Sequence, residues 1–255
     1  MIVKKTGLAF ALAASLSMMF AIPQAQAGDL IVSGAASLTN AFKEIGTAFQ
    51  SRHPATKLQY NFASSDTLLQ QIAKGAPVDV FASADQETMD KAETQKLITA
   101  STRKNFVGNT LVVILPSDSS AAVKSLADLK QPGFKKIAIG NPASVPVGRY
   151  TKEVLEAAGA WSALEGKMIM AQNVRQSLDY VARAEVDAGF VYGTDAAIQR
   201  DKVKVALTVP TQKPITYPIA ATAASANAVE AAQFVDFTLT PEAQAIFAKY
   251  GFSKP

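Results

Sequence analysis

Strand-like apolar runs alternate with helix-like amphipathic patterns along most of this chain. Residues 29–33 form the first such run and predict a strand. After it, Phe42, Ile45 and Phe49 lie at helical spacing, which predicts a helix with one apolar stripe. Alternation of this kind is typical of parallel strands joined by helices that cover both faces of a sheet. The sequence therefore predicts an α/β fold.

The same pattern continues toward the C-terminus. Further predicted strands are 58–63, 78–82, 111–115, 136–140, 167–171, 188–192, 203–209 and 215–222. The last helix has the clearest boundaries, because Thr240 suits the N-cap, Pro241 the first helical position, and Gly251 the residue just past its end.

A chain of 255 residues has the length of one large domain or of two smaller lobes. Ligands of open α/β sheets bind beyond the carboxyl ends of the strands. We therefore expect two parallel-sheet lobes that face each other across a ligand-binding cleft. The predicted first lobe comprises 28–112 and 217–255, and the second comprises 113–216, with strands 111–115 and 215–222 as the crossovers.

The first residues have the pattern of a secretory signal peptide. Lys4 and Lys5 precede an apolar run over 7–22, and the small-residue site Ala25-Gln26-Ala27 follows it. The apolar run is short for a membrane anchor, which is the alternative. We predict cleavage after Ala27 and a periplasmic location.

The composition excludes several classes of function. The chain has no cysteine, so it forms no disulfide and carries no thiolate chemistry. Its formal net charge is +4, of which two lysines lie in the signal segment, and no basic stripe marks a nucleic-acid surface. His53 is the only histidine and lies at a predicted helix end, so neither a Ser-His-Asp triad nor a histidine metal site is expected. We also find no G-x-S-x-G, Walker A or dinucleotide-binding motif.

Four short segments follow predicted strands and could together hold an oxyanion. They are 35–40, 62–65, 145–148 and 189–193. Where a strand gives way to a helix, unpaired backbone N–H groups and the positive end of the helix dipole face the same point. Several such ends, with hydroxyl groups between them, can bind an anion without a charged side chain. This predicts a binding protein rather than an enzyme.

Individually, the residues of these segments have simpler interpretations. Ser37 and Ser65 could serve as helix caps, and Tyr192 could be a packing tyrosine. Val147 and Val174 can contribute only their backbone N–H groups.

Together with their order along the chain, the segments resemble a known family. The resemblance is carried by Ala35-Ala36-Ser37-Leu38-Thr39-Asn40-Ala41, Phe62-Ala63-Ser64-Ser65, Gly75-Ala76-Pro77-Val78-Asp79-Val80-Phe81, Ala84-Asp85-Gln86, Val145-Pro146-Val147-Gly148, Val174-Arg175 and Val191-Tyr192-Gly193-Thr194-Asp195. These motifs are similar to those of the periplasmic molybdate-binding components of ABC transporters, and the similarity runs from Leu30 to Phe252.

The resemblance implies a type II periplasmic binding protein with two lobes that close on the ligand. By motif position it implies hydroxyl donors from Ser37, Ser65 and Tyr192, and amide donors from Ser37, Ser65, Val147 and Val174. Molybdenum would be bound as its oxyanion, not as a bare cation, and no cofactor is implied. The implied partner is a membrane permease, and the implied state is a monomer.

A site that only donates hydrogen bonds suits a fully deprotonated dianion, because such an ion only accepts them. Protonated phosphate is therefore disfavoured, whereas molybdate and tungstate are nearly equal in size and are not separated by this argument.

Two alternatives stay open: a binding protein for sulfate or a small carboxylate, and a secreted hydrolase. A carboxylate ligand would call for an arginine, and Arg149 and Arg175 lie close to the site segments; otherwise both are expected to face solvent. Asp66 follows the second segment and is expected to turn away from the anion as a helix cap.

Overall fold

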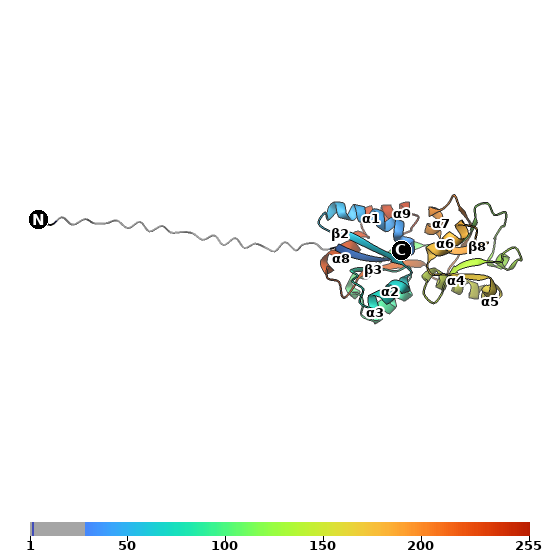
Figure 1. Ribbon diagram of the computed structural model, residues 1–255, viewed down its shortest axis with the longest axis horizontal. Coiled ribbons are helices and arrows are strands. Elements are labelled where there is room, and N and C mark those ends of the chain that lie inside the picture. The colour runs from blue at the N-terminus through green and yellow to red at the C-terminus, as the bar shows by residue number, and fades with distance from the viewer. Residues whose placement is uncertain (1, 3–28) are drawn as a thin grey trace.

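A computed structural model describes residues 29–255 together with Ile2 (Figure 1). The predicted signal peptide and its cleavage position after Ala27 lie outside the described residues, Ile2 excepted. The described chain forms two lobes side by side, each built around one five-stranded sheet.

The first sheet has the strand order β2-β1-β3-β10-β4. Its strands are β1 (Asp29–Ala35), β2 (Lys57–Ala63), β3 (Val80–Ala82), β4 (Lys104–Asn109) and β10 (Ile215–Ala221). The second sheet has the order β7-β6-β8-β5-β9. Its strands are β5 (Leu111–Pro116), β6 (Ile137–Gly140), β7 (Met168–Ala171), β8 (Ala188–Tyr192) and β9 (Val203–Val209).

Each sheet is mixed rather than wholly parallel. β1 pairs in parallel with β2 and β3, and β6 pairs in parallel with β7 and β8, as the alternating pattern predicted. In contrast, β10 is antiparallel to β3 and β4, and β5 is antiparallel to β8 and β9. These strands adjoin the places where the chain passes between the sheets, so no crossover helix forces them to run parallel to their neighbours.

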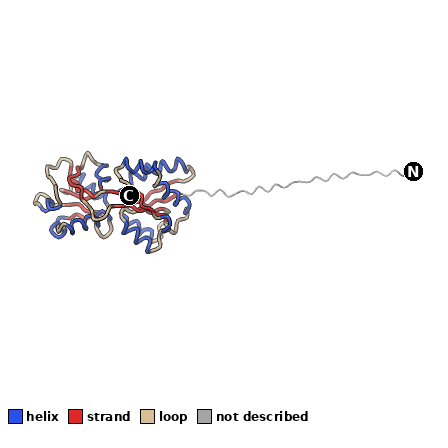
Figure 2. The backbone as a smooth tube through the Cα atoms, turned by 180° about the vertical axis from the view of Figure 1, so that it is seen from behind, coloured by secondary structure: helices blue, strands red, loops and turns tan. Residues whose placement is uncertain are grey.

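Helices cover the faces of both sheets (Figures 1 and 2). In the first lobe these are α1 (Thr39–Arg52), α2 (Ser65–Ala73), α3 (Gln86–Thr94), α8 (Ala228–Phe237) and α9 (Pro241–Lys249). In the second they are α4 (Pro146–Ala157), α5 (Trp161–Leu164), α6 (Val174–Ala182) and α7 (Gly193–Ile198). The sequence signals at α9 are confirmed: the Thr240 hydroxyl accepts from the Ala243 N–H, and Gly251 has a positive φ of 86°.

The chain passes between the two sheets twice. It leaves β4 at Asn109 and enters β5 at Leu111, and it returns between Val209 and Ile215. Every residue of β5 is buried, as its uninterrupted apolar sequence predicted. The two passages lie next to one another, because β4 pairs with β10 and β5 with β9.

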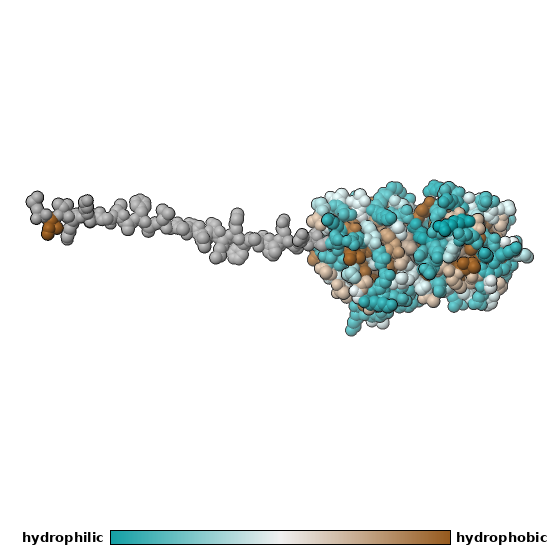
Figure 3. All heavy atoms as spheres, viewed as in Figure 1, coloured by the Kyte–Doolittle hydropathy of each residue, from teal (hydrophilic) through white to brown (hydrophobic). Residues whose placement is uncertain are grey.

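Hydrophilic residues cover much of the face seen in Figure 3, and apolar ones lie there in small groups. Within the part of the chain that the structure describes, we find no helix with the length and apolar character needed to cross a membrane.

Candidate oxyanion site

The five residues predicted to bind the anion line one small cavity between the lobes. About 210 Å³ of space inside it, its open mouth included, is free of atoms. The lining residues come from the predicted segments: Ala35, Ala36, Ser37, Ala63, Ser64, Ser65, Ala84, Val145, Pro146, Val147, Asn173, Val174 and Tyr192. The set contains no Asp, Glu, Lys or Arg, so the polar groups at this cavity are uncharged.

Three of the backbone N–H groups at the cavity belong to the first turn of a helix. Ser65 is the first residue of α2, Val174 is the first of α6, and Val147 is the second of α4. N–H groups in a first helical turn have no partner within the helix, and the positive end of the helix dipole lies beside them. Ser37 lies in a short 3-10 helix, Ala36–Leu38, directly after β1. The strand-to-helix junctions therefore bring amide donors from both lobes to one point.

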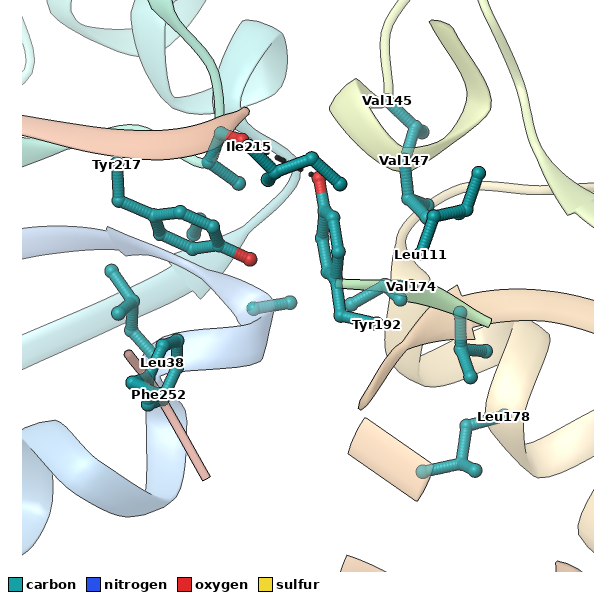
Figure 4. Close-up of a cluster of buried hydrophobic side chains, with 14 of the residues drawn as sticks. Leu38, Leu111, Val145, Val147, Val174, Leu178, Tyr192, Ile215, Tyr217 and Phe252 are labelled. Atoms are coloured by element: carbon teal, nitrogen blue, oxygen red, sulfur yellow. Dashed lines mark hydrogen bonds between the residues drawn. The ribbon is translucent and has the colours of Figure 1, made fainter. Parts of the chain in front are cut away.

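The hydroxyl groups have defined partners. The Ser65 hydroxyl accepts a hydrogen bond from the Ala84 N–H at 3.0 Å, which leaves its own proton free. The Tyr192 hydroxyl lies 3.4 Å from the Ala84 carbonyl oxygen, a weak contact that an anion can replace. Burial raises the pKa of Tyr192 well above its ordinary value, so this group keeps its proton and remains a donor. Figure 4 shows Tyr192 between Tyr217 of the first lobe and Val147 of the second.

Arg149 does not face solvent, contrary to one of the two expectations for it. It lies on α4, and its guanidinium donates across the cleft to Asp85 at 2.6 Å and to Asp66 at 2.7 Å. It also reaches the Thr88 hydroxyl at 2.8 Å. Both acids belong to the first lobe and are buried. Arg149 is absent from the cavity lining, so it joins the lobes without lining the cavity.

Asp66 turns away from the cavity, as expected, but it does not cap α2. Its carboxylate accepts from Thr88, Lys91 and Arg149, and no side-chain cap bond is made at the start of this helix. The charged partners outcompete the cap, because a carboxylate gains more from hydrogen bonds to cations than from one backbone N–H.

Arg175 also crosses between the lobes and is also not a free surface residue. It lies on α6, pairs with Asp195 at 2.5 Å, and donates to the Asn40 side chain at 2.9 Å and to the Ser37 carbonyl at 3.2 Å. It thereby holds the backbone of a predicted anion-binding residue from behind. Neither the arginine nor its partner Asp195 lines the cavity.

Asp195 should give stability an unusual pH dependence. Burial raises its pKa to about 6, although the charge of Arg175 lowers it, and one of its oxygens has no hydrogen-bond partner. The folded state therefore holds this proton at pH values where the unfolded chain has released it. Between about pH 4 and pH 6 this group alone should lower the free energy of unfolding by about 2–3 kcal/mol as pH rises.

Asp195→Asn cannot ionise, so from pH 4 to pH 6 the free energy of unfolding of the wild type, measured with urea, should fall relative to that of the variant. Parallel pH profiles for the two proteins would contradict the assignment.

Sequence reasoning missed two residues behind the cavity, Tyr217 and Asn109. The Tyr217 hydroxyl lies 3.0 Å from the Ser37 hydroxyl and accepts from the Asn109 side chain at 3.1 Å. Both residues lie on strands of the first sheet, β10 and β4. No motif pointed to them, because they approach Ser37 only through the pairing of strands far apart in sequence.

The one histidine of the chain lies where its sequence context predicted. His53 follows α1 and stacks on Phe49 with ring centroids 4.2 Å apart, as a helix-end residue would. Within residues 29–255, no cluster of three or more His, Cys, Asp or Glu side chains could hold a metal ion.

The arrangement of two mixed five-stranded sheets with a small cavity between the lobes has clear relatives. The sequence profile described as bacterial extracellular solute-binding protein matches residues 30–253. The chain belongs to this family. Its members bind solutes, so this is a binding protein and not an enzyme.

Individual members of known sequence or structure are similar to this chain over most of its length. The molybdate-binding protein ModA of Escherichia coli is 40% identical over 240 residues, which cover 90% of each chain. Among solved structures, the substrate-binding domain of a putative molybdenum ABC transporter from Clostridium difficile is 38% identical, with a TM-score of 0.68, and covers 89% of this chain and 99% of that one. The periplasmic molybdate-binding protein of Azotobacter vinelandii has a TM-score of 0.76 at 25% identity, with the same coverage.

Proposed function

We propose that this family member binds molybdate, and tungstate with it, as the substrate-binding component of an ABC transporter. The observation that carries the proposal is the cavity: hydroxyl and amide groups from both lobes line it, and no charged side chain does. The relatives named above, of which one is 40% identical, support the same ligand.

The proposed ligands are the hydroxyls of Ser37, Ser65 and Tyr192, and the backbone N–H groups of Ser37, Ser65, Val147 and Val174. Molybdate is a dianion that only accepts hydrogen bonds, and these groups can all donate. Each hydrogen bond to a charged ligand contributes about 1.5–3 kcal/mol, so half a dozen of them bind tightly without a counter-charge.

The proposed selectivity follows from protonation and size. Hydrogen phosphate carries a proton that needs an acceptor, and no carboxylate lines the cavity to provide one. Sulfate is smaller than molybdate, so it cannot reach donors on all sides at once. A small carboxylate would call for an arginine, and both nearby arginines are engaged by Asp side chains.

The proposed cycle is closure on the anion followed by delivery to a membrane permease. The moving units would be the lobes 28–112 with 217–255 and 113–216, and the two passages between the sheets lie within a few residues of these boundaries. We further propose that the protein acts as a monomer in the periplasm after cleavage behind Ala27.

Calorimetric titration of the purified protein with molybdate, tungstate, sulfate and phosphate tests the proposal. We expect tight one-to-one binding of the first two anions and far weaker binding of the others. Sulfate binding comparable to that of molybdate would contradict the size argument and favour a general oxyanion-binding protein.

A further inference from the structure

A chain of hydrogen bonds outside the cavity ends on the Ser37 hydroxyl. It runs from Asn109, at the end of β4, to the hydroxyl of Tyr217 on β10, and from there to Ser37. The Asn109 amide also donates to the Thr194 hydroxyl of the second lobe at 2.9 Å. Tyr217 is fully buried and does not line the cavity. Its role therefore has to be exerted through Ser37.

The orientation of Asn109 is fixed by the backbone beside it. Its side-chain oxygen accepts from the Thr110 N–H at 2.9 Å. The amide nitrogen therefore faces Tyr217 and Thr194, and it can only donate. If the amide oxygen and nitrogen of Asn109 exchanged places, the nitrogen would face the Thr110 N–H, and this N–H would lose its acceptor.

The direction of the next hydrogen bond follows from this orientation. The Tyr217 oxygen accepts from Asn109, so the tyrosine proton needs an acceptor of its own. Among the described residues, the Ser37 oxygen is the only acceptor within hydrogen-bonding distance of it. If Ser37 donated instead, a fully buried hydroxyl proton would have no partner, which is costly.

Two features keep the Tyr217 hydroxyl protonated and directed at Ser37. Burial raises the pKa of Tyr217 well above its ordinary value, so the hydroxyl stays protonated. Its ring is held by edge-on contacts with Tyr192, Phe106 and Phe252, at centroid distances of 5.6, 6.5 and 5.7 Å (Figure 4 labels Tyr192 and Phe252). A ring packed on three sides cannot swing its hydroxyl to another partner.

Because Ser37 accepts from Tyr217, its own proton is left for the cavity. Ser65 is in the same situation, since its oxygen accepts from the Ala84 N–H. The protein thus supplies a hydrogen-bond donor to each of the two serines whose hydroxyls we propose bind the anion, Ser37 and Ser65. A serine hydroxyl can otherwise either donate or accept, so without these donors the cavity could also receive a protonated anion.

We propose that Asn109 and Tyr217 are positioning residues that set the selectivity of the site by forcing Ser37 to donate. This inference rests on the proposed function, because it concerns how the same cavity separates molybdate from hydrogen phosphate. The hydrogen bonds from Asn109 through Tyr217 to Ser37, here called the relay, make the Ser37 hydroxyl a donor toward the cavity, a property that Ser37 alone does not guarantee.

Tyr217→Phe tests the proposal by removing one oxygen atom. The readout is the ratio of the association constants for molybdate and hydrogen phosphate. Both constants are measured by calorimetry, with phosphate as a competitor, at a pH above the second pKa of phosphate. Both ions then carry two charges. We expect the ratio to fall about tenfold, because Ser37 becomes free to accept the phosphate proton.

Tyr60→Phe is the matched control. Tyr60 lies on β2 in the same lobe, and its hydroxyl donates to the Phe42 carbonyl at 2.8 Å, away from the cavity. This variant loses the same atom and also a partly buried hydrogen bond. We expect its ratio to match that of the wild type within about twofold, which separates lost structure from lost selectivity.

Asn109→Asp tests the direction of the relay. The new carboxylate accepts the Tyr217 proton, so Ser37 must donate to Tyr217 and present lone pairs to the cavity. The added charge repels both dianions alike, so the ratio still reports the Ser37 proton, and it should fall further than in Tyr217→Phe.

If the wild type does not bind molybdate, the proposed function fails together with this inference. If the wild type binds it and the ratio of every folded relay variant stays within about twofold of the wild-type ratio, the inference alone is wrong.

Discussion

Val174→Pro should weaken molybdate binding about 10-fold to 150-fold while leaving the fold intact. The substitution removes one backbone N–H that we propose donates to the anion. A hydrogen bond to a charged ligand contributes about 1.5–3 kcal/mol, and each 1.4 kcal/mol is a factor of ten in affinity. The measurement is calorimetric titration with molybdate.

The structure makes this position unusually suitable for proline. Val174 is the first residue of α6, where proline is favoured because the N–H has no helical partner. Asn173 before it has φ −161° and ψ 171°, an extended conformation that a following proline accepts. The Asn173 side chain caps the helix through Gln176, so the cap does not depend on the lost N–H.

Val174→Ala is the control for the lost side chain. It removes apolar contacts at a residue that is only 4% exposed, but it keeps the amide donor. We expect Val174→Ala to bind molybdate nearly as well as the wild type, and thermal unfolding to show that both variants are folded. Equal loss of affinity in the two variants would mean that packing, not the amide, matters here.

Arg149→Met should weaken molybdate binding roughly 30-fold to 150-fold, although Arg149 does not touch the cavity. The arginine joins α4 of the second lobe to Asp85 and Asp66 of the first. Its removal leaves two buried carboxylates without their shared guanidinium partner at the contact between the lobes. Breaking a buried pair costs about 3–5 kcal/mol, and we expect about 2–3 here because 15% of the arginine side chain stays exposed.

The loss appears in affinity because, in the cycle we propose, the anion binds to the closed protein. A change that destabilises the closed arrangement lowers the apparent affinity by the same free energy. We therefore expect a faster dissociation rate in Arg149→Met, measurable by stopped-flow competition with tungstate.

Two further variants isolate the ion pair. Lys152→Met removes a positive charge from the same helix. Lys152 pairs with Glu156 one turn away and lies 5.6 Å from the centre of the Trp161 ring, and both partners belong to the second lobe, so we expect little change. Asp85→Asn keeps the N-cap of α3 and removes the charge, so combining it with Arg149→Met should restore part of the affinity. If the double variant binds no better than Arg149→Met, the carboxylate is not what opposes closure.

Local sequence patterns were sufficient for much of the fold. The apolar run of β5, the strand-to-helix junction after β1 and the capped helix α9 are each encoded within about a dozen residues. The candidate anion-binding residues could be named for the same reason, since each lies at such a junction. That the five line one cavity follows from the strand order, because the carboxyl ends of the parallel strands face the cleft.

The charged residues near the site could not be assigned in this way. Arg149 and Arg175 were expected either to face solvent or to bind a ligand, and instead they pair with Asp85, Asp66 and Asp195. The partners are 20 to 83 positions apart in sequence. A helical pattern tells which way a side chain points from its own helix, but not which groups the neighbouring lobe brings to meet it.

The sequence by itself determined the α/β class, the junctions that present amide and hydroxyl donors, and the lack of any charged group within those junctions, because each depends on neighbouring residues alone. The tertiary structure decided the antiparallel placement of β5 and β10, the arginine bridges between the lobes and the relay from Asn109 through Tyr217 to Ser37. Tyr217 and Ser37 are 180 positions apart, and only the pairing of β10 within the first sheet brings the two hydroxyls within 3.0 Å.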